Sequence, residues 1–437
     1  MTTPAAICNK RSMKVLLISA NTETINMPVL PLGMASVAAA AEQGGHNVSL
    51  LNLLESLDIS ADIRDAIQQG QPDIVGISVR NIDDQSMDDP RFFLDPVRQI
   101  VHECRINTGV PVVLGGAGYS IFPLEVLEYT GADYGIQGEG EDAFCGLLEC
   151  IAARRDPATV AGVHTRGSGR ENPPRSDGHL DAFPLPLPSV HIDIPMHPEE
   201  ALWFPYQTRR GCPMECSYCS TPLIEGARLR FRKTDAIVDN IRRFAEKGVR
   251  RFYFVDNIFN IPESYAKDLC NAIIAADLSI RWRCIVYPTR ISDSLAAAMA
   301  RAGCEQVAFG YESGSPEVLS RLGKQFSPDE VALASHTLRR HSIGQMGFLL
   351  LGGPGETYET VKETLAFSDS LPLDALKITT GIRIYPRTPL AAEALREGLL
   401  TETDNLIMPR FYLRPEMAEW LPAYMEDWAS ERPHCMF

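Results

Sequence analysis

The sequence lacks any run of about 18 consecutive apolar residues, so it predicts no membrane-spanning helix. No apolar core followed by a small-residue cleavage site is visible near residue 1, and we therefore expect a cytoplasmic protein. Basic residues are also scarce, because 41 Lys and Arg against 56 Asp and Glu give a formal net charge of −15. Proteins that grip nucleic acid through its phosphates usually carry a basic face, so the charge argues against a nucleic-acid partner.

The cysteines do not form a pattern typical of a disulfide framework. Their number, eleven, is odd, and most are scattered through the 437 residues. We interpret these scattered cysteines as structural thiols. Three others, Cys212, Cys216 and Cys219, lie close together in the sequence and need a separate explanation.

The first 160 residues alternate short apolar segments with helical segments. Such a pattern predicts a parallel sheet covered on both faces, and the number of strands fits a doubly wound, Rossmann or flavodoxin-like α/β domain. The expected strands are 14–19, 46–51, 73–78, 110–115 and 134–137, and the clearest helices are 31–43 and 61–69.

A proline-rich and turn-rich stretch, residues 161–198, predicts a linker. The strand and helix alternation then restarts and predicts a partial (β/α)6 barrel over 199–390, with its chemistry at the C-terminal ends of the strands. In the C-terminal extension, 391–437, no strand–helix unit is evident. The expected barrel strands are 203–208, 251–255, 281–287, 306–311, 347–351 and 375–384, with helices such as 234–246 and 292–301.

The crowded cysteines point to a metal centre on a loop after the first barrel strand. Three and then two residues separate Cys212, Cys216 and Cys219, and Gly211 and Pro213 favour a tight loop. A structural zinc site normally needs four ligands, and no fourth Cys or His lies nearby. A [4Fe–4S] cluster held by three cysteines leaves one iron open to a small molecule. The spacing therefore predicts such a cluster.

The sequence here resembles the radical S-adenosylmethionine (SAM) superfamily. Its signature is Cys-x-x-x-Cys-x-x-Cys with an aromatic residue before the third cysteine, which is Tyr218 here. The resemblance implies that the open iron binds SAM and that reduction releases a 5′-deoxyadenosyl radical. It extends to the segments Phe254-Val-Asp-Asn-Ile-Phe259, Gly310-Tyr-Glu-Ser-Gly314, Gly352-Gly-Pro-Gly-Glu-Thr357 and Tyr385-Pro-Arg-Thr-Pro-Leu390.

Within these segments we assign candidate SAM-binding residues, each with a structural alternative. Tyr218 would pack beside the adenine, or serve as a core aromatic. Glu312, followed by Ser313, is suited to the ribose hydroxyls, or to a structural ion pair. Gly352 and Gly353 would let the backbone approach a ligand, or simply form a tight turn.

Two further candidates carry charge. Asp256 could accept a hydrogen bond from the SAM amino group, or cap the helix that follows it. Arg290 could meet a carboxylate, or form an exposed salt bridge. The basic segment 228–233 could contact an anionic group of the substrate, although a solvated basic face is the common fate of such a segment. No residue is assigned to catalysis itself.

The first domain resembles the cobalamin-binding domains that precede many radical SAM enzymes. Matching segments are Pro31-Leu-Gly-Met-Ala, Gly44-Gly-His-Asn-Val and Gly138-Glu-Gly-Glu141. No histidine occurs in the loop 21–28, and Gly118 stands where relatives often have one, so cobalt would lack a histidine ligand from the protein. Because such sheets bind ligands beyond the strand C-termini, the candidate cobalamin-binding residues are Asn21, Ser78, Gly115, Gly116, Gly138 and Glu139.

Together these features predict a cobalamin-dependent radical SAM enzyme, and above all a C-methyltransferase acting on an unactivated carbon of a small molecule. An external electron donor of the flavodoxin or ferredoxin type would reduce the cluster. Cyclisation, rearrangement, carbon–carbon coupling and sulfur insertion stay open, as does a vestigial first domain. Cys435 could then reach the site from a mobile tail, or be an idle thiol. A sensor without turnover is a further alternative.

Overall fold

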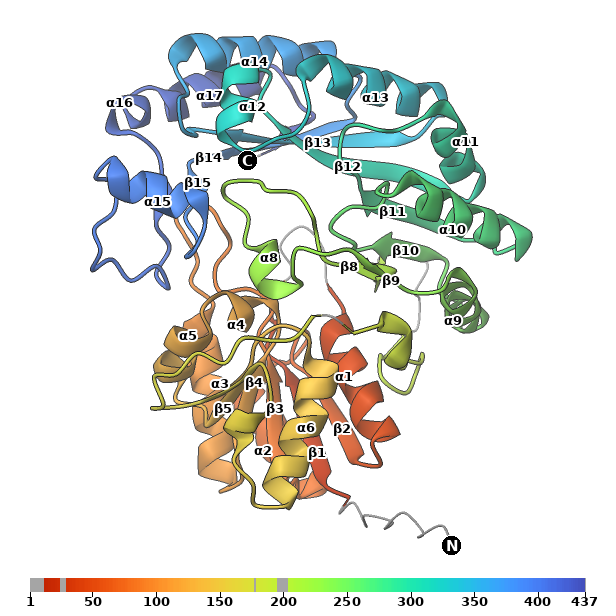
Figure 1. The fold of residues 1–437 in the computed structure, drawn as a ribbon, viewed down its shortest axis with the longest axis vertical. Coiled ribbons are helices and arrows are strands. Elements are labelled where there is room, and N and C mark those ends of the chain that lie inside the picture. The colour runs from red at the N-terminus through yellow and green to blue at the C-terminus, as the bar shows by residue number, and fades with distance from the viewer. Residues whose placement is uncertain (1–11, 24–28, 177, 195–202, 437) are drawn as a thin grey trace, which may run out of the picture. The chain divides into compact units, whose positions relative to one another are not determined.

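The computed structural model describes residues 12–23, 29–176, 178–194 and 203–436, which form two compact units (Figure 1). The first unit is drawn from Met1–Ile82, Phe93–Gly178 and Ala182–Asp193. The second is drawn from Asp83–Phe92, His179–Asp181 and Ile194–Phe437. None of the described helices is long and apolar enough to cross a membrane.

The first unit is the predicted doubly wound α/β domain. Its sheet has the order β2-β1-β3-β4-β5-β6, in which the first five strands are parallel. The strands are nearly continuous apolar runs because helices cover both faces. The strands are β1 (Lys14–Ser19), β2 (Asn47–Asn52), β3 (Ile74–Ser78), β4 (Val112–Gly115), β5 (Tyr134–Ile136) and β6 (Val163–Thr165), and the helices are α1 (Leu32–Gln43), α2 (Ile59–Gly70), α3 (Leu94–Asn107), α4 (Ala117–Ile121), α5 (Pro123–Thr130) and α6 (Gly140–Ala152).

The core of this unit lies between the sheet and the helix pair α1 and α6. Met34 and Ala38 of α1 and Phe144 and Leu147 of α6 pack there against buried strand residues such as Val15. Helices α2 and α3 contact each other and form a second pair. The strand order changes direction between β1 and β3, so the C-terminal ends of these two strands mark the switch point at which doubly wound sheets bind ligands.

The described residues of the predicted linker 161–198 are only partly a linker, and residues 177 and 195–198 lie outside the described part. The segment contains β6, which pairs antiparallel with β5, and therefore the sheet has six strands where the sequence predicted five. Farther along, the Nε2 atom of His191 lies 2.9 Å from the Oε2 atom of Glu42 on α1. A three-residue edge strand has too few positions to show a period, which explains why the sequence pattern missed it.

The second unit is the predicted partial barrel, a sheet of parallel strands in the order β17-β14-β13-β12-β11-β10-β7. All six predicted barrel strands are present. They are β7 (Phe204–Tyr206), β10 (Arg251–Phe254), β11 (Arg281–Ile285), β12 (Cys304–Glu312), β13 (Gly344–Leu351) and β14 (Ala375–Thr380), and the helices among them are α9 (Thr234–Glu246), α10 (Glu263–Ala275), α11 (Asp293–Arg301), α12 (Pro316–Arg321), α13 (Pro328–Arg340) and α14 (Tyr358–Ser370).

Side chains alternate between the two faces of this curved sheet. Phe204 packs 4.4 Å, between ring centroids, from Phe244 of α9, and Phe254 packs 5.0 Å from Trp282, so these residues face the helices. Residues that alternate with Phe254 and Trp282 on β10 and β11, such as Tyr253 and Arg283, face the opposite side and are half-buried. We call this opposite side the concave face.

The C-terminal extension is more regular than predicted. It contains β16 (Phe411–Tyr412), which pairs with β15 (Ile382–Arg383), and the helices α15 (Pro389–Arg396), α16 (Pro415–Ala418) and α17 (Leu421–Ser430). The chain then enters β17 (Cys435–Met436), a parallel strand against β14. Arg432 anchors it with two 2.8 Å contacts to the carboxylate of Asp369. The expectation that Cys435 sits on a mobile tail is therefore wrong.

Candidate functional site

The three clustered cysteines lie on a loop in the second unit that begins after β8 (Arg209–Arg210), a short strand paired with β9 (Arg230–Phe231). Gly211 opens the loop at φ +88°, and a Cβ atom there would lie 2.1 Å from the carbonyl oxygen of Arg228. Gly323 holds the other side at φ +70°, where a Cβ atom would lie 2.4 Å from the Glu215 oxygen. Only glycine fits at both positions, so the loop is fixed by its neighbours.

The thiols of this loop fit an iron–sulfur cluster. Cys212, Cys216 and Cys219 are free, and they are close enough for Cys216 and Cys219 each to raise the pKa of Cys212. Burial is the main cause that brings the Cys212 pKa to about 11. Among the described residues, no three His, Cys, Asp or Glu side chains are spaced for a single metal ion. A cluster spreads its cysteines over separate irons, so three thiols without a fourth ligand suit a cluster better than zinc.

Asp256 organises the entrance to the cysteine loop. Its carboxylate is fully buried and accepts hydrogen bonds from the backbone N–H groups of Thr208 and Arg209, at 2.7 and 3.1 Å, and from the Thr208 hydroxyl at 2.5 Å. The Arg209 guanidinium lies 3.3 Å away. Neither predicted role matches this arrangement, because α10 begins after Pro262 and the carboxylate is already occupied by protein donors.

A buried triad of Glu312, Lys324 and Tyr218 lies beside the loop. Glu312 Oε1 accepts hydrogen bonds from the Tyr218 hydroxyl at 2.8 Å and from Lys324 Nζ at 3.1 Å. Lys324 also donates to the Tyr218 oxygen at 2.9 Å. Burial alone would lower the Lys324 pKa, but the Glu312 carboxylate opposes it and the pKa is raised well above its usual value. The ion-pair alternative for Glu312 is therefore present.

Glu312 also has an unusual backbone. It ends β12 at φ +60°, next to an irregularity in the pairing of β12 with β13. Residues other than glycine rarely adopt this backbone conformation, and such backbone strain is concentrated at functional sites. Tyr218 serves partly as the predicted core aromatic, because its ring packs on the apolar cluster that includes Leu322 and Ile384.

The glycine-rich turn after β13 is held by a glutamate. Glu356 Oε2 accepts hydrogen bonds from the backbone N–H groups of Gly352 and Gly353. This matches the tight-turn alternative for the two glycines. Oε1 of Glu356 is buried and has no hydrogen-bond partner among the described residues. Burial raises the pKa of Glu356 to about 7.

At three other predicted positions, the side chains contact other parts of the protein. Ser313 is fully buried, with its hydroxyl 2.8 Å from the Thr364 hydroxyl, and does not reach the surface of the site. Arg290 is exposed at φ +55°, and its charge helps to lower the Glu330 pKa. The basic segment 228–233 is solvated only in part: Arg228 and Lys233 are exposed, but Arg232 is buried and donates to the Leu180 carbonyl oxygen at 2.7 Å.

The six candidate residues of the first unit lie along one edge of its sheet. They follow the C-terminal ends of the neighbouring strands β1, β3, β4 and β5, and all are half-buried: Asn21, Ser78, Gly115, Gly116, Gly138 and Glu139. Gly116 has φ +99°, and a Cβ atom there would lie 2.5 Å from the Val79 oxygen. The edge is therefore lined with backbone and small side chains, which suits a broad, flat ligand.

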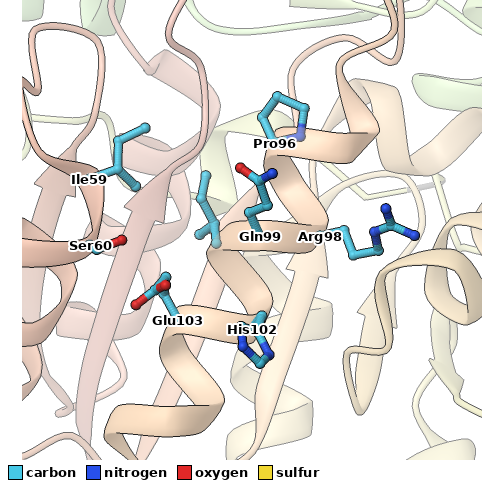
Figure 2. A pocket seen from close by; sticks show the side chains of 8 residues that line it. Ile59, Ser60, Pro96, Arg98, Gln99, His102 and Glu103 are labelled. Carbon is cyan, nitrogen blue, oxygen red and sulfur yellow. The ribbon is translucent and has the colours of Figure 1, made fainter.

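A separate hollow of about 430 Å³ lies between α2 and α3 of the same unit (Figure 2). Ile59 and Ser60 come from the start of α2, and the other lining residues come from α3. None of the six candidate residues lines this hollow. It is thus distinct from the edge described above.

Comparisons with known proteins agree with this division. Residues 206–368 match the radical SAM superfamily model, and residues 18–148 match the B12 binding domain model. An uncharacterised methyltransferase of Pyrococcus horikoshii, PH0819, is 30% identical over 402 residues, which cover 89% of this chain and 84% of the relative. The chain belongs to the radical SAM superfamily. Its B12-binding match assigns it to the members with that N-terminal domain.

Further relatives of this radical SAM protein are methyltransferases. Tryptophan 2-C-methyltransferase of Streptomyces laurentii is 26% identical, and the match covers 87% of this chain and 74% of that methyltransferase. The structure of TsrM, a radical SAM methyltransferase of Kitasatospora setae with cobalamin and a [4Fe-4S] cluster bound, superimposes with a TM-score of 0.80. It is 26% identical, and the match covers 89% of this chain and 75% of TsrM. The predicted fold class and enzyme class are confirmed.

Sequence reasoning missed four polar residues of the radical SAM unit. Arg209 and Glu356 are buried, and the Lys324 side chain is 5% exposed. Arg209 and Lys324 pair with carboxylates that are distant in the sequence, whereas Glu356 is held by backbone N–H groups of its own turn. Glu225 accepts from Gly211 N at 2.9 Å and so helps to hold the cysteine loop. The glycine-rich segment around Glu356 was visible, but no local pattern signalled that the other three would be buried.

The raised pKa of Glu356 predicts a specific pH dependence of stability. The unfolded chain releases this proton near its ordinary pKa of 4.5, whereas the folded protein retains it up to about 7. The free energy of unfolding should therefore fall as the pH rises through this window, by about 3 kcal/mol. In Glu356→Gln we expect this decrease in the free energy of unfolding to vanish. Urea unfolding at several pH values between about 4.5 and 7 measures it.

The matched control is Glu317→Gln, which alters an exposed glutamate on α12. Its pH profile should follow that of the unmodified protein, because the substitution leaves Glu356 and its buried surroundings in place. Equal slopes in the Glu356→Gln variant and the unmodified protein would show that Glu356 is ionised when folded.

Proposed function

We propose that this protein is a cobalamin-dependent radical SAM C-methyltransferase that modifies an unactivated carbon of a small molecule. The observation that carries the proposal is the presence of two candidate sites in one chain. A three-thiol loop lies in the barrel unit after β8, and a glycine-lined edge lies at the C-terminal ends of β4 and β5, beside the switch point of the first sheet. A sensor without turnover would not require both.

Cys212, Cys216 and Cys219 would hold the [4Fe–4S] cluster, which supplies an electron to cleave bound SAM. Lys324 contributes the positive charge nearest to this loop, since its ammonium group lowers the Cys216 pKa against the dominant effect of burial. The same ammonium group suits the SAM carboxylate, and Glu312 suits the ribose hydroxyls. Both groups are already held in place by Tyr218.

In the first unit, the edge formed by Gly115, Gly116 and Gly138 would hold cobalamin, which carries the methyl group. The sequence offers no histidine in the loop 20–28, so the residues of this edge would bind the corrin through backbone and small side chains. An external flavodoxin-type or ferredoxin-type donor would supply electrons. Free thiols on the described part of the chain suit the reducing cytoplasm.

The products of SAM test the proposal. Each methylated product should consume two SAM molecules: one gives up its methyl group and leaves S-adenosylhomocysteine, and the other is reductively cleaved to methionine and 5′-deoxyadenosine. We expect both products when the reconstituted protein receives SAM, cobalamin and a reductant. S-adenosylhomocysteine alone would indicate methyl transfer without a radical, and 5′-deoxyadenosine alone would favour cyclisation or rearrangement. Neither product would support the sensor alternative.

A further inference from the structure

Two arginines lie on neighbouring strands of the concave face of the radical SAM unit. Arg251 of β10 and Arg283 of β11 are half-buried there. The alternation of the strands puts them opposite the residues that pack on the helices. Neither the cysteine loop nor the Glu312 triad uses either of them. Lys377 of β14 shares this face but lies in register with Phe348, two rows nearer the C-terminal ends of the strands.

Arg283 stacks on an indole ring and keeps one buried nitrogen unpaired among the described residues. Its guanidinium carbon lies 3.8 Å from the ring centroid of Trp203, and the indole is 8% exposed. The buried Nε atom has no hydrogen-bond partner among the described residues. Stacking on an indole fixes the plane of the guanidinium and leaves its N–H edge available to a planar oxyanion.

Arg283 shares its carboxylate neighbour with a second arginine. Glu305 acts on Arg283, but this carboxylate forms an ion pair with Arg281. Arg251 lies 5.7 Å from the same Trp203 ring, so two cations share one indole. Burial is the main cause that lowers the Arg283 pKa, and Arg251 adds to it. An added anion would offset the repulsion between the two cations.

Polar neighbours complete a subsite around Arg283. Tyr253 of β10 and Gln306 of β12 are its direct partners in the strand register. Both are half-buried on the same face. Burial is the main cause that raises the Tyr253 pKa to about 12, so this hydroxyl stays protonated and can donate a hydrogen bond. Three side chains from adjacent strands thus offer donors to one ligand group.

Toward the C-terminal ends of β11, β12 and β13, the concave face becomes apolar. Ile285, Ala308 and Met346 form the next row in register, and Phe348 lies beyond them on β13. Two residues of an extended strand span about 7 Å, so Arg283 lies roughly that far below the end of β11 at Ile285. A ligand anchored at Arg283 would extend its apolar part toward the end that carries the cysteine loop.

We propose that the substrate is a small molecule with one oxyanion, a carboxylate or a phosphoryl group, which Arg283 binds together with Tyr253 and Gln306. This inference rests on the proposed function only in identifying the bound molecule as the substrate. The apolar row at Ile285, Ala308 and Met346 then contacts the body of the molecule. Arg283 is a specificity residue here, since it discriminates charge at one end while the reaction takes place at the other.

Binding of simple probes tests the assignment without knowledge of the substrate. Isothermal titration of the reconstituted full-length protein would compare benzoate and phenylphosphonate with the neutral isostere benzamide. We expect at least one anion to bind about tenfold or more tightly than benzamide, because a charge-assisted contact is lost in the amide. The stronger of the two anions tells whether the site prefers a carboxylate or a phosphoryl group.

Arg283→Gln should weaken binding of the preferred anion about tenfold or more and leave benzamide unchanged. The affinity of Arg283→Lys for the anion should lie between those of the unmodified protein and Arg283→Gln, because lysine keeps the charge and loses the planar guanidinium. The matched control is Arg281→Gln, two residues away on the same strand, where the exposed guanidinium pairs with Glu305. Unchanged circular dichroism and cluster absorbance would confirm that the variants fold.

Absence of anion binding, equal affinity for benzamide, or an equal loss in Arg281→Gln would overturn the inference. The SAM products measured on the same preparations keep it separate from the proposed function. Anion binding that depends on Arg283 without any SAM turnover would contradict the methyltransferase and leave the anion site standing. SAM turnover without a preference for anions would support the methyltransferase and contradict the anion site.

Discussion

Replacing Cys216 by alanine is expected to abolish assembly of the iron–sulfur cluster and, with it, cleavage of SAM. Three thiols on one loop leave no spare ligand, because the sequence has no fourth Cys or His close to Cys212 and Cys219. Changes in groups that only support metal ligands cost about 10- to 100-fold, so loss of a ligand should reduce 5′-deoxyadenosine formation by more than about 100-fold. Iron and sulfide content, visible absorbance and 5′-deoxyadenosine yield measure the effect.

The control for this prediction is Cys435→Ala. Cys435 is also a free thiol and is half-buried, but it lies in β17 at the edge of the sheet. Its replacement should leave iron content and 5′-deoxyadenosine formation unchanged. An intact, active cluster in Cys216→Ala would contradict the assignment of the loop, and loss of activity in Cys435→Ala would revive the role of this cysteine in chemistry.

Breaking the buried pair of Lys324 and Glu312 is expected to destabilise the protein strongly. Both side chains are less than one-tenth exposed, so Lys324→Met leaves the Glu312 carboxylate buried without its cation. Removing one partner of a buried pair typically costs about 3–5 kcal/mol. Urea unfolding of the protein without SAM, followed by circular dichroism, measures this loss.

Two further variants separate the charge effect from a packing effect. The double variant Lys324→Met with Glu312→Gln should recover a large part of the loss, because no uncompensated charge then remains. Arg321→Met breaks the exposed pair of Arg321 and Glu317 and should cost no more than about 1 kcal/mol. If the double variant were as unstable as Lys324→Met, the loss would come from packing and the pair would not hold the site together.

The sequence predicted those parts of the structure that repeat or that require a particular residue type. Parallel strands buried on both faces stand out as apolar runs, which is why five strands of the first sheet were found. The six barrel strands were found because short strand segments recur between amphipathic helices. The cysteine loop was visible because few other arrangements explain three close thiols. The strands β6 and β17 were missed, since they span three and two residues and are defined by their partners' backbones.

Roles that depend on distant partners were harder to predict. Asp256 follows a barrel strand, as a ligand-binding carboxylate would, yet its four contacts with Thr208 and Arg209 make it part of the loop's support. Lys324 comes near Glu312 only because a helix and a turn return the chain to the strand end. A local sequence pattern carries no information on such a long-range contact. A lysine is also usually expected on the surface, whereas this one is buried.

Corrinoid retention tests the central claim most directly. The protein would be reconstituted anaerobically with iron, sulfide and hydroxocobalamin, desalted, and examined by absorbance beside the variant Gly115→Leu. Gly115 lies at the end of β4, and the nearest atom to an added Cβ is the Ile136 oxygen at 3.8 Å, so leucine fills the edge without a clash at its Cβ. We predict close to one cobalamin per chain in the unmodified protein and a clear loss in the variant. A normal cluster with no retained corrinoid would contradict the methyltransferase account.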